Sequence, residues 1–223
     1  MLINYSYMLW MLPALAISVW AQWRVQYGAA RPGSGLTGYA AAEAVLERNG
    51  VRGVSIEPVP GSLTDHYDPR TNTIRLSDPV YAHASVSAVG VAAHEAGHAV
   101  QYAQGYAPML LRKAILPLCN AGAGLAPWLL LAGLLLDVAQ LYLAGIIAFS
   151  AAAVFQLVTL PVEFNASARA LQALEAGGAL TAEERRGVRS VLTAAALTYV
   201  AALLTALLQI LYFVSRYNGR GKR

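Results

Sequence analysis

The stretch VAAHEAGHAV, residues Val91–Val100, contains the residues around which the rest of the chain is organised. On an α-helix, residues four positions apart lie on one face, so His94 and His98 can direct two imidazoles at the same point. Glu95 adds a carboxylate beside that point without occupying it. This spacing is typical of zinc hydrolases, in which the glutamate takes a proton from the attacking water. The stretch therefore predicts a helix with a zinc site, ending near Gly105.

The 223-residue chain is 57% hydrophobic and only 13% charged, which is too apolar for an ordinary soluble protein. A helix of about 20 apolar residues is long enough to cross a hydrocarbon core. Four stretches reach that length: Leu2–Ala21, Ala114–Leu136, Val138–Leu160 and Val191–Val214. We therefore expect an α-helical membrane protein with four transmembrane helices. Transport is disfavoured as its function, because the spans carry almost no charge.

The net charge of +4 does not indicate a nucleic-acid partner. The basic residues lie beside the spans and form no stripe interleaved with aromatic residues, so the membrane explains them more simply. The single cysteine, Cys119, excludes an intramolecular disulfide framework and a multi-cysteine zinc site. The lipid bilayer is therefore the partner that composition predicts.

A short α+β region is predicted between the first two spans. A linker over Tyr27–Gly38 leads to a helix over Tyr39–Arg48 and a strand over Val54–Val59. Leu63–Asp68 and Thr73–Ser77 then form a predicted β-hairpin before the histidine helix. An edge strand there could hold an extended peptide beside the metal, or the hairpin could simply complete a small core. The sequence leaves both interpretations open.

A catalytic zinc site usually has three protein ligands and one open position, so two histidines need a third partner. His66 and His83 lie upstream, and Glu163 follows the third predicted span. Glu163 is the candidate that we favour. The alternative is that its carboxylate only complements the dipole at the start of a helix, which requires no metal.

The order of the spans tests this choice. If Ala114–Leu136 and Val138–Leu160 form a hairpin that turns at Asp137, then His94 and Glu163 emerge on the same side of the membrane. Eight basic residues flank the spans on that side and four on the other, which favours a cytoplasmic position for the histidines. The first set is Arg24, Arg31, Arg112, Lys113, Arg169, Arg185, Arg186 and Arg189, and the second is Arg216, Arg220, Lys222 and Arg223.

Four blocks of sequence resemble the YugP-like neutral zinc metallopeptidases, a family of small bacterial multi-pass membrane proteins. The blocks are SGLTG (34–38), LTDHYDPR (63–70), VGVAAHEAGHA (89–99) and QLVTLPVEFNAS (156–167). The layout is more distantly similar to the HtpX-like membrane proteases. This resemblance implies a small α+β domain of the glutamate-zincin type carried on membrane helices of the bacterial inner membrane.

The resemblance also implies the roles of four residues: His94, His98 and Glu163 as zinc ligands and Glu95 as the general base. Many glutamate zincins place an aspartate four residues after the ligand glutamate, where it orients the first histidine; here that position is Ser167. Support for the ligands is then expected from Asn165, Ser167 or Asp65. The candidates for a donor to the reacting oxyanion, or for substrate contact, are His66, Tyr67 and Arg169.

The predicted function is hydrolysis of peptide bonds in membrane-associated or membrane-proximal polypeptides. The alternative is a membrane scaffold with a structural or vestigial zinc site, but structural zinc sites usually have four protein ligands, and only three are found. The oligomeric state is not indicated. The expected organisation is a first transmembrane helix in 1–23, a zincin-like domain in 24–113, a transmembrane hairpin in 114–160, a helical segment with the third ligand in 161–190, and a fourth transmembrane helix with a basic tail in 191–223.

Overall fold

A computed structural model describes residues 5–29, 33 and 35–220. The start of the predicted first span, part of the predicted linker and the end of the basic tail lie outside these residues. The described chain forms two compact units. The first, which we call the helical unit, contains residues up to Val19, Leu111–Leu160 and the residues from Thr198 onward. The second, the mixed unit, contains Trp20–Leu110 and Pro161–Leu197, and therefore all the candidate site residues.

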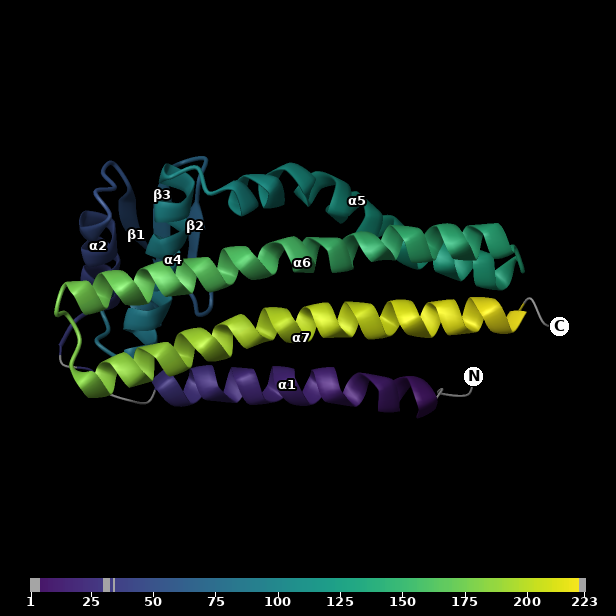
Figure 1. Ribbon diagram of the computed structural model, residues 1–223, viewed down its shortest axis with the longest axis horizontal. Helices are drawn as coiled ribbons and strands as arrows, with labels where there is room; N and C mark the ends of the chain where they lie inside the picture. Colours follow the sequence, from purple (N-terminus) through teal and green to yellow (C-terminus); the bar gives the residue numbers. More distant parts are fainter. Residues whose placement is uncertain (1–4, 30–32, 34, 221–223) are drawn as a thin grey trace. The chain divides into compact units, whose positions relative to one another are not determined.

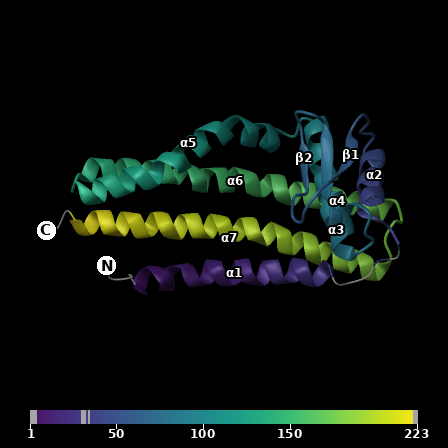
Figure 2. The same cartoon turned by 180° about the vertical axis from the view of Figure 1, so that it is seen from behind.

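The mixed unit contains a small sheet and the histidine helix α4 (Figures 1 and 2). Its shorter elements are α2 (Gly38–Arg48), β1 (Ser55–Val59), β2 (His66–Asp68), β3 (Thr73–Ser77), α3 (Asp78–Tyr81) and α4 (Val86–Ala103). The strand order is β1-β3-β2, with β1 parallel and β2 antiparallel to β3. The predicted hairpin is therefore confirmed, and β2 is an edge strand of this sheet.

Capping side chains explain where α2 and α4 begin, and a glycine explains where α4 ends. The Thr37 hydroxyl accepts a hydrogen bond from the Ala40 amide at the start of α2, and Ser85 does the same for Ala88 at the start of α4. Such caps satisfy amides that have no partner within the helix. After α4, Gly105 has a φ of 62°, a left-handed conformation that suits glycine, so the predicted helix end is confirmed.

The core of the mixed unit lies where the sheet, α2 and α4 meet the ends of two long helices. Ile74 on the central strand, Val45 on α2 and Val100 on α4 have no exposed surface. Leu174 and Val188, which belong to the long helices, are equally buried and complete the same cluster. The hairpin therefore contributes to the core, which was one of the two roles that the sequence left open for it.

Four long helices account for most of the remaining chain: α1 (Tyr5–Ala29), α5 (Ala107–Leu135), α6 (Ala139–Ala176) and α7 (Ala182–Arg220). Within the described residues, three of them, α5, α6 and α7, are long and apolar enough to cross a membrane. The prediction of four membrane helices was therefore wrong. The first predicted span, Leu2–Ala21, falls in α1, which is not one of the three. The ends of that stretch are rich in Tyr, Trp and Ser, which favour the headgroup region over hydrocarbon.

The boundaries around Glu163 also differ from the prediction. The predicted third span and the first part of the predicted segment 161–190 form one helix, because α6 continues through Pro161 and ends only before Gly177, with Gly178 at a φ of 62°. The last part of that segment belongs to α7. Proline removes a single helical hydrogen bond, and membrane helices tolerate that loss. The 38 residues of α6 extend about 57 Å, against about 30 Å of hydrocarbon, so one helix can both span a bilayer and project beyond it.

A tight turn joins α5 to α6, as the zinc hypothesis required. Asp137, the predicted turn residue, adopts a left-handed φ of 54°. Within the helical unit the two helices approach closely at small residues. A Cβ built on Gly122 would lie 2.8 Å from the carbonyl oxygen of Ala148. The small residues of the second predicted span therefore form a helix interface.

A similarly close approach joins α4 to α6 in the mixed unit. Gly97 lies between the two histidines, and a Cβ at this position would lie 2.5 Å from the carbonyl oxygen of Ala166. Real Cβ atoms do not approach carbonyl oxygens this closely, so one of the two backbones would have to move. Gly90, one turn from His94 on the same helix, has more room: its nearest neighbour would be a Val191 methyl at 3.5 Å.

Gly97→Ala is therefore expected to push α4 away from α6. The free energy of unfolding should fall by about 1–3 kcal/mol, as for other overpacked sites, and zinc affinity should fall with it. Gly90→Ala is the matched control, because its added methyl makes an ordinary contact. Thermal unfolding and zinc titration of both variants test this, and equal behaviour of the two would contradict the close approach.

Candidate metal centre

Three side chains from α4 and α6 meet in the mixed unit. Nε2 of His94 lies 3.1 Å from Oε2 of Glu163, and Nε2 of His98 lies 3.5 Å from the same oxygen. The three candidate ligand atoms lie within 4.8 Å of one another. Glu163 is only 1% exposed and His98 only 8%, so this is a buried group rather than a chance surface cluster.

This cluster fits a catalytic zinc ion. Two imidazoles and one carboxylate are a ligand set found in catalytic zinc sites, which keep a fourth position for water. A buried carboxylate requires a compensating positive charge or a metal, and here the histidine nitrogens face it. Glu163 lies well inside α6, far from the first turn at Ala139, so the alternative of a charge at a helix start does not apply.

The charges around His98 favour its binding to a cation or proton. Burial alone would lower the pKa of His98, but the hydrogen bond with Glu163 and the negative charge of Glu95 outweigh it and raise the pKa above its ordinary value. The same two carboxylates would attract a metal cation. Because a ligand imidazole must be neutral, metal binding would replace this proton.

His94 has a second contact that fixes the direction of its ring. Its Nδ1 lies 3.1 Å from Oγ of Ser167, which occupies the position where many glutamate zincins have aspartate. Ser167 therefore touches the first histidine despite the shorter side chain. With Nδ1 engaged there, Nε2 is the nitrogen that faces Glu163.

His98 is held by Gln101, a residue that the sequence analysis missed. Nδ1 of His98 lies 3.0 Å from Oε1 of Gln101, whose Nε2 donates to the Val162 carbonyl at 2.7 Å and to Asn165 Oδ1 at 3.0 Å. Gln101 is completely buried. It lies three residues after His98 on the same helical face, and this spacing was the available signal.

The direction of these hydrogen bonds determines the tautomer of His98. A backbone carbonyl can only accept, so the Gln101 amide nitrogen must face Val162, and its oxygen must face His98. Nδ1 of His98 is then the donor. In the neutral ring Nε2 carries a lone pair, which is the form that a metal requires.

Arg169 and Asn165 belong to the outer part of this network. Nε of Arg169 donates to Asn165 Oδ1 at 2.6 Å, and the same guanidinium donates to Gln104 and lies 5.7 Å from the ring centre of Tyr106. An arginine can only donate, so it turns the Asn165 oxygen toward Gln101. Both residues were predicted near the site, and they support it through Gln101.

The candidate base Glu95 is held by the edge strand. Its Oε2 accepts a hydrogen bond of 2.9 Å from the backbone amide of Tyr67, which lies on β2. The Tyr67 hydroxyl donates to Asn72 instead, and burial, with Tyr102 and Asp68 nearby, raises the pKa of Tyr67 to about 12. The phenol therefore stays protonated, and the backbone of Tyr67, rather than its side chain, contacts the site.

Two other predicted candidates have partners elsewhere. Nδ1 of His66 lies 2.7 Å from the Thr64 carbonyl oxygen, and its side chain is exposed. The Asp65 carboxylate accepts hydrogen bonds from the amide and hydroxyl of Ser77 and so braces the hairpin. The structure therefore does not join either residue to the histidine cluster through its described contacts.

The fold and the cluster define a class: a helical protein with membrane-spanning helices and a buried site of two histidines and a glutamate. The chain belongs to the family described as "Putative neutral zinc metallopeptidase", which it matches over residues 7–218. It is 49% identical over 215 residues to the "Putative membrane protease YugP" of Bacillus subtilis (strain 168), covering 94% of this chain and 96% of that protein. No solved structure matches the chain.

The predicted family and the predicted zinc cofactor are therefore confirmed, and the relative is described as a membrane protease. Family membership implies a polypeptide substrate, and the three apolar helices imply a lipid bilayer. The His94, His98 and Glu163 cluster is the group that could hold the ion.

Removing the Gln101 contacts should weaken metal binding. In Gln101→Met the side chain keeps its length but loses its hydrogen bonds, and we expect zinc affinity to fall about 10–100-fold, as for other residues that orient a metal ligand. Gln101→Glu can still accept from His98 but cannot donate to Val162, so its affinity should be intermediate. Gln172→Met, at an exposed position of α6, is the control, and competitive zinc titration is the measurement. Wild-type affinity in Gln101→Met would contradict the positioning role.

Proposed function

We propose that this chain is a membrane-embedded zinc metalloprotease that hydrolyses peptide bonds in membrane-associated or membrane-proximal polypeptides. The observation that carries the proposal is the meeting of His94, His98 and Glu163, with the Glu95 carboxylate beside them on α4. His94 and Glu95 are partly exposed whereas Glu163 is buried, so the cluster is accessible from the side of the base.

In this proposal His94, His98 and Glu163 hold the zinc ion. Zinc, when bound there, polarises a carbonyl group and lowers the pKa of water. Glu95 takes a proton from the attacking water and passes it to the leaving amine. The Tyr67 amide holds one oxygen of this carboxylate, which leaves the other oxygen available for the proton.

The edge strand β2 is suited to hold the substrate. The Tyr67 amide on this edge strand donates to Glu95 on α4, so the edge of the sheet lies beside the proposed base. An extended peptide that pairs with this edge would place its main chain next to the base. The hairpin would then have both roles that the sequence left open: it would complete the core and hold the substrate.

The alternative is a non-catalytic membrane scaffold with a structural zinc ion. Structural sites usually have four protein ligands, and the cluster in the described residues offers three. The missing ligand favours catalysis, because a fourth position is then free for water. A wild-type protein that binds one zinc ion per chain and cleaves no polypeptide would favour the scaffold.

The helical unit supports attachment to a bilayer. Large apolar side chains on its helices are exposed, including Leu118, Trp128 and Leu135 on α5, Leu157 on α6 and Leu211 on α7. Such a surface is stable in lipid and aggregates in water. We place the protein in the bacterial inner membrane with the mixed unit on the cytoplasmic side, since more of the basic residues flank the spans on that side.

Glu95→Gln should keep the metal and lose the activity. We expect zinc to remain at one ion per chain and kcat/KM for an unfolded polypeptide to fall by at least about 100-fold, because glutamine cannot accept the proton. A chelator should abolish wild-type cleavage, and added zinc should restore it. Metal analysis and a proteolysis assay on the purified full chain test this.

Glu163→Ala is the complementary variant, for which we expect loss of zinc and of activity together. Its stability in detergent should be measured in parallel, since it also removes a buried charge. Stoichiometric zinc with full activity in this variant would show that Glu163 is not a ligand.

The orientation can be tested by cysteine labelling. In a Cys119→Ser background, single cysteines are placed at Glu183, at the start of α7, and at Ser215, near its end; both positions are exposed. A membrane-impermeant maleimide should label Ser215→Cys in right-side-out spheroplasts and Glu183→Cys only in inverted vesicles. The reverse pattern would place the mixed unit outside the cytoplasm.

A further inference from the structure

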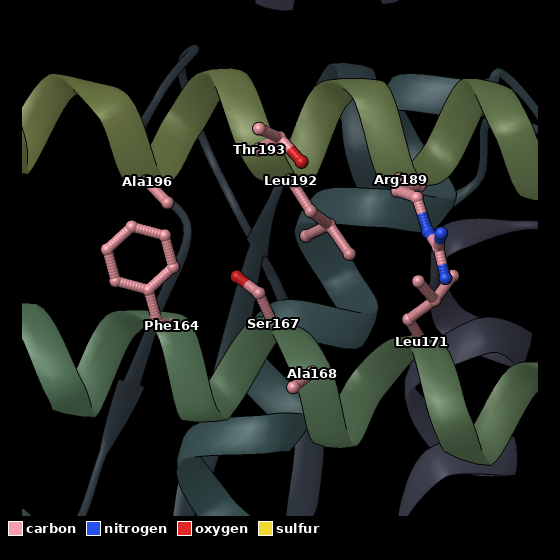
Figure 3. Close-up of a pocket in the computed structure, with 8 residues that line it drawn as sticks. All are labelled: Phe164, Ser167, Ala168, Leu171, Arg189, Leu192, Thr193 and Ala196. Carbon is pink, nitrogen blue, oxygen red and sulfur yellow. The ribbon is translucent and has the colours of Figure 1, made fainter.

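A small cavity opens between α6 and α7 in the mixed unit (Figure 3). Its volume is about 160 Å³. From α6 it is lined by Phe164, Ser167, Ala168 and Leu171, and from α7 by Arg189, Leu192, Thr193 and Ala196. It lies outside the group of ligands described above, and the proposed mechanism does not use it.

One residue joins this cavity to the metal centre. Ser167 lines the cavity, and its hydroxyl lies 3.1 Å from Nδ1 of His94. Figure 3 shows the Ser167 side chain pointing into the space between the two helices. A group bound in the cavity would therefore be separated from a proposed zinc ligand by a single serine side chain.

The lining determines what the cavity could bind. Phe164, Ala168 and Leu192 present apolar surface, and the hydroxyls of Ser167 and Thr193 are uncharged. An apolar cavity of about 150 Å³ is large enough for benzene. The cavity thus has room for one aliphatic side chain of medium size, and not for a folded partner or a lipid tail.

One end of the cavity carries a positive charge. Arg189 extends from α7 toward Leu171 (Figure 3), and its Nη2 lies 4.0 Å from Oε1 of Glu175. The arginine side chain is 68% exposed, so water weakens the effect of its charge without removing it. A lysine or arginine side chain would be repelled at this end.

We propose that this cavity is the specificity pocket of the protease: it binds the medium-sized aliphatic side chain of a substrate residue next to the scissile bond and disfavours basic residues there. The inference rests on the proposed function, since it needs a polypeptide held over the metal centre.

The test compares cleavage of a peptide library by the zinc-loaded full-length protein, with product ends identified by mass spectrometry. Thr193→Leu narrows the cavity. We compare peptides that carry leucine or alanine at one position beside the cleaved bond. The ratio of their kcat/KM values, leucine over alanine, should fall about tenfold, because one methylene in an apolar pocket changes kcat/KM by about that factor. Cleavage of the alanine peptide should stay near the wild-type rate, which also shows that the variant is folded.

Two further variants and a control make the test specific. Ala168→Leu narrows the cavity from the opposite helix and should shift the preference in the same way at the same position. Arg189→Gln should leave the size preference unchanged and raise cleavage of peptides with lysine at that position a few-fold. Ala182→Leu adds the same volume at an exposed position of α7 outside the cavity, and should change nothing.

The outcomes separate the two proposals. If the wild-type protein cleaves no peptide, the proposed function fails. If it cleaves peptides but Thr193→Leu and Ala168→Leu keep the wild-type preference, or slow all peptides equally, the cavity is not a specificity pocket and the proposed function is unaffected.

Discussion

The arrangement of the metal centre depends on the close approach of α4 and α6 at Gly97. The Ala166 carbonyl oxygen occupies the space where any other residue would have its Cβ. This contact lies between the two histidines of α4 and a few residues after Glu163 on α6. It sets how near the two helices come, and hence whether nitrogen and oxygen atoms of three ligands can reach one point. The hydrogen bonds of Ser167 and Gln101 then determine how each imidazole is turned.

A chain of directional hydrogen bonds extends outward from this contact. Arg169 can only donate, and the Val162 carbonyl can only accept. Between them, the amides of Asn165 and Gln101 have a single satisfactory orientation, and it presents the proton-free Nε2 of His98 to the cluster. Residues without any contact to Nε2 of His98 therefore select the tautomer that this proposed ligand adopts when its ring is neutral. Buried polar networks of this kind are stable only when every member has a partner.

The part of this site that depends on local geometry could be predicted from the sequence. The spacing of His94 and His98 predicts a common helix face, and Asp137 predicts the turn that brings Glu163 back to the same side. What could not be predicted depends on contacts between distant segments. The sequence does not show that Gln101 contacts Val162, a residue that lies far away along the chain. Pro161 suggests the end of a helix, although α6 continues through it. The first predicted span was wrong because the aromatic and polar residues at its ends lower the hydropathy of a stretch that is otherwise long enough to cross a membrane.

The contact between Tyr67 and Glu95 has a consequence for genetics. The group that holds the proposed base is a main-chain N–H, which almost every amino acid at position 67 would supply equally well. In a saturation mutagenesis screen, the effects of substitutions at this position would therefore reflect loss of the buried ring and of its bond to Asn72. They would not reveal the role of the amide. Only proline lacks this donor, so a role shared by nineteen residue types would remain hidden in the tolerance profile of the position.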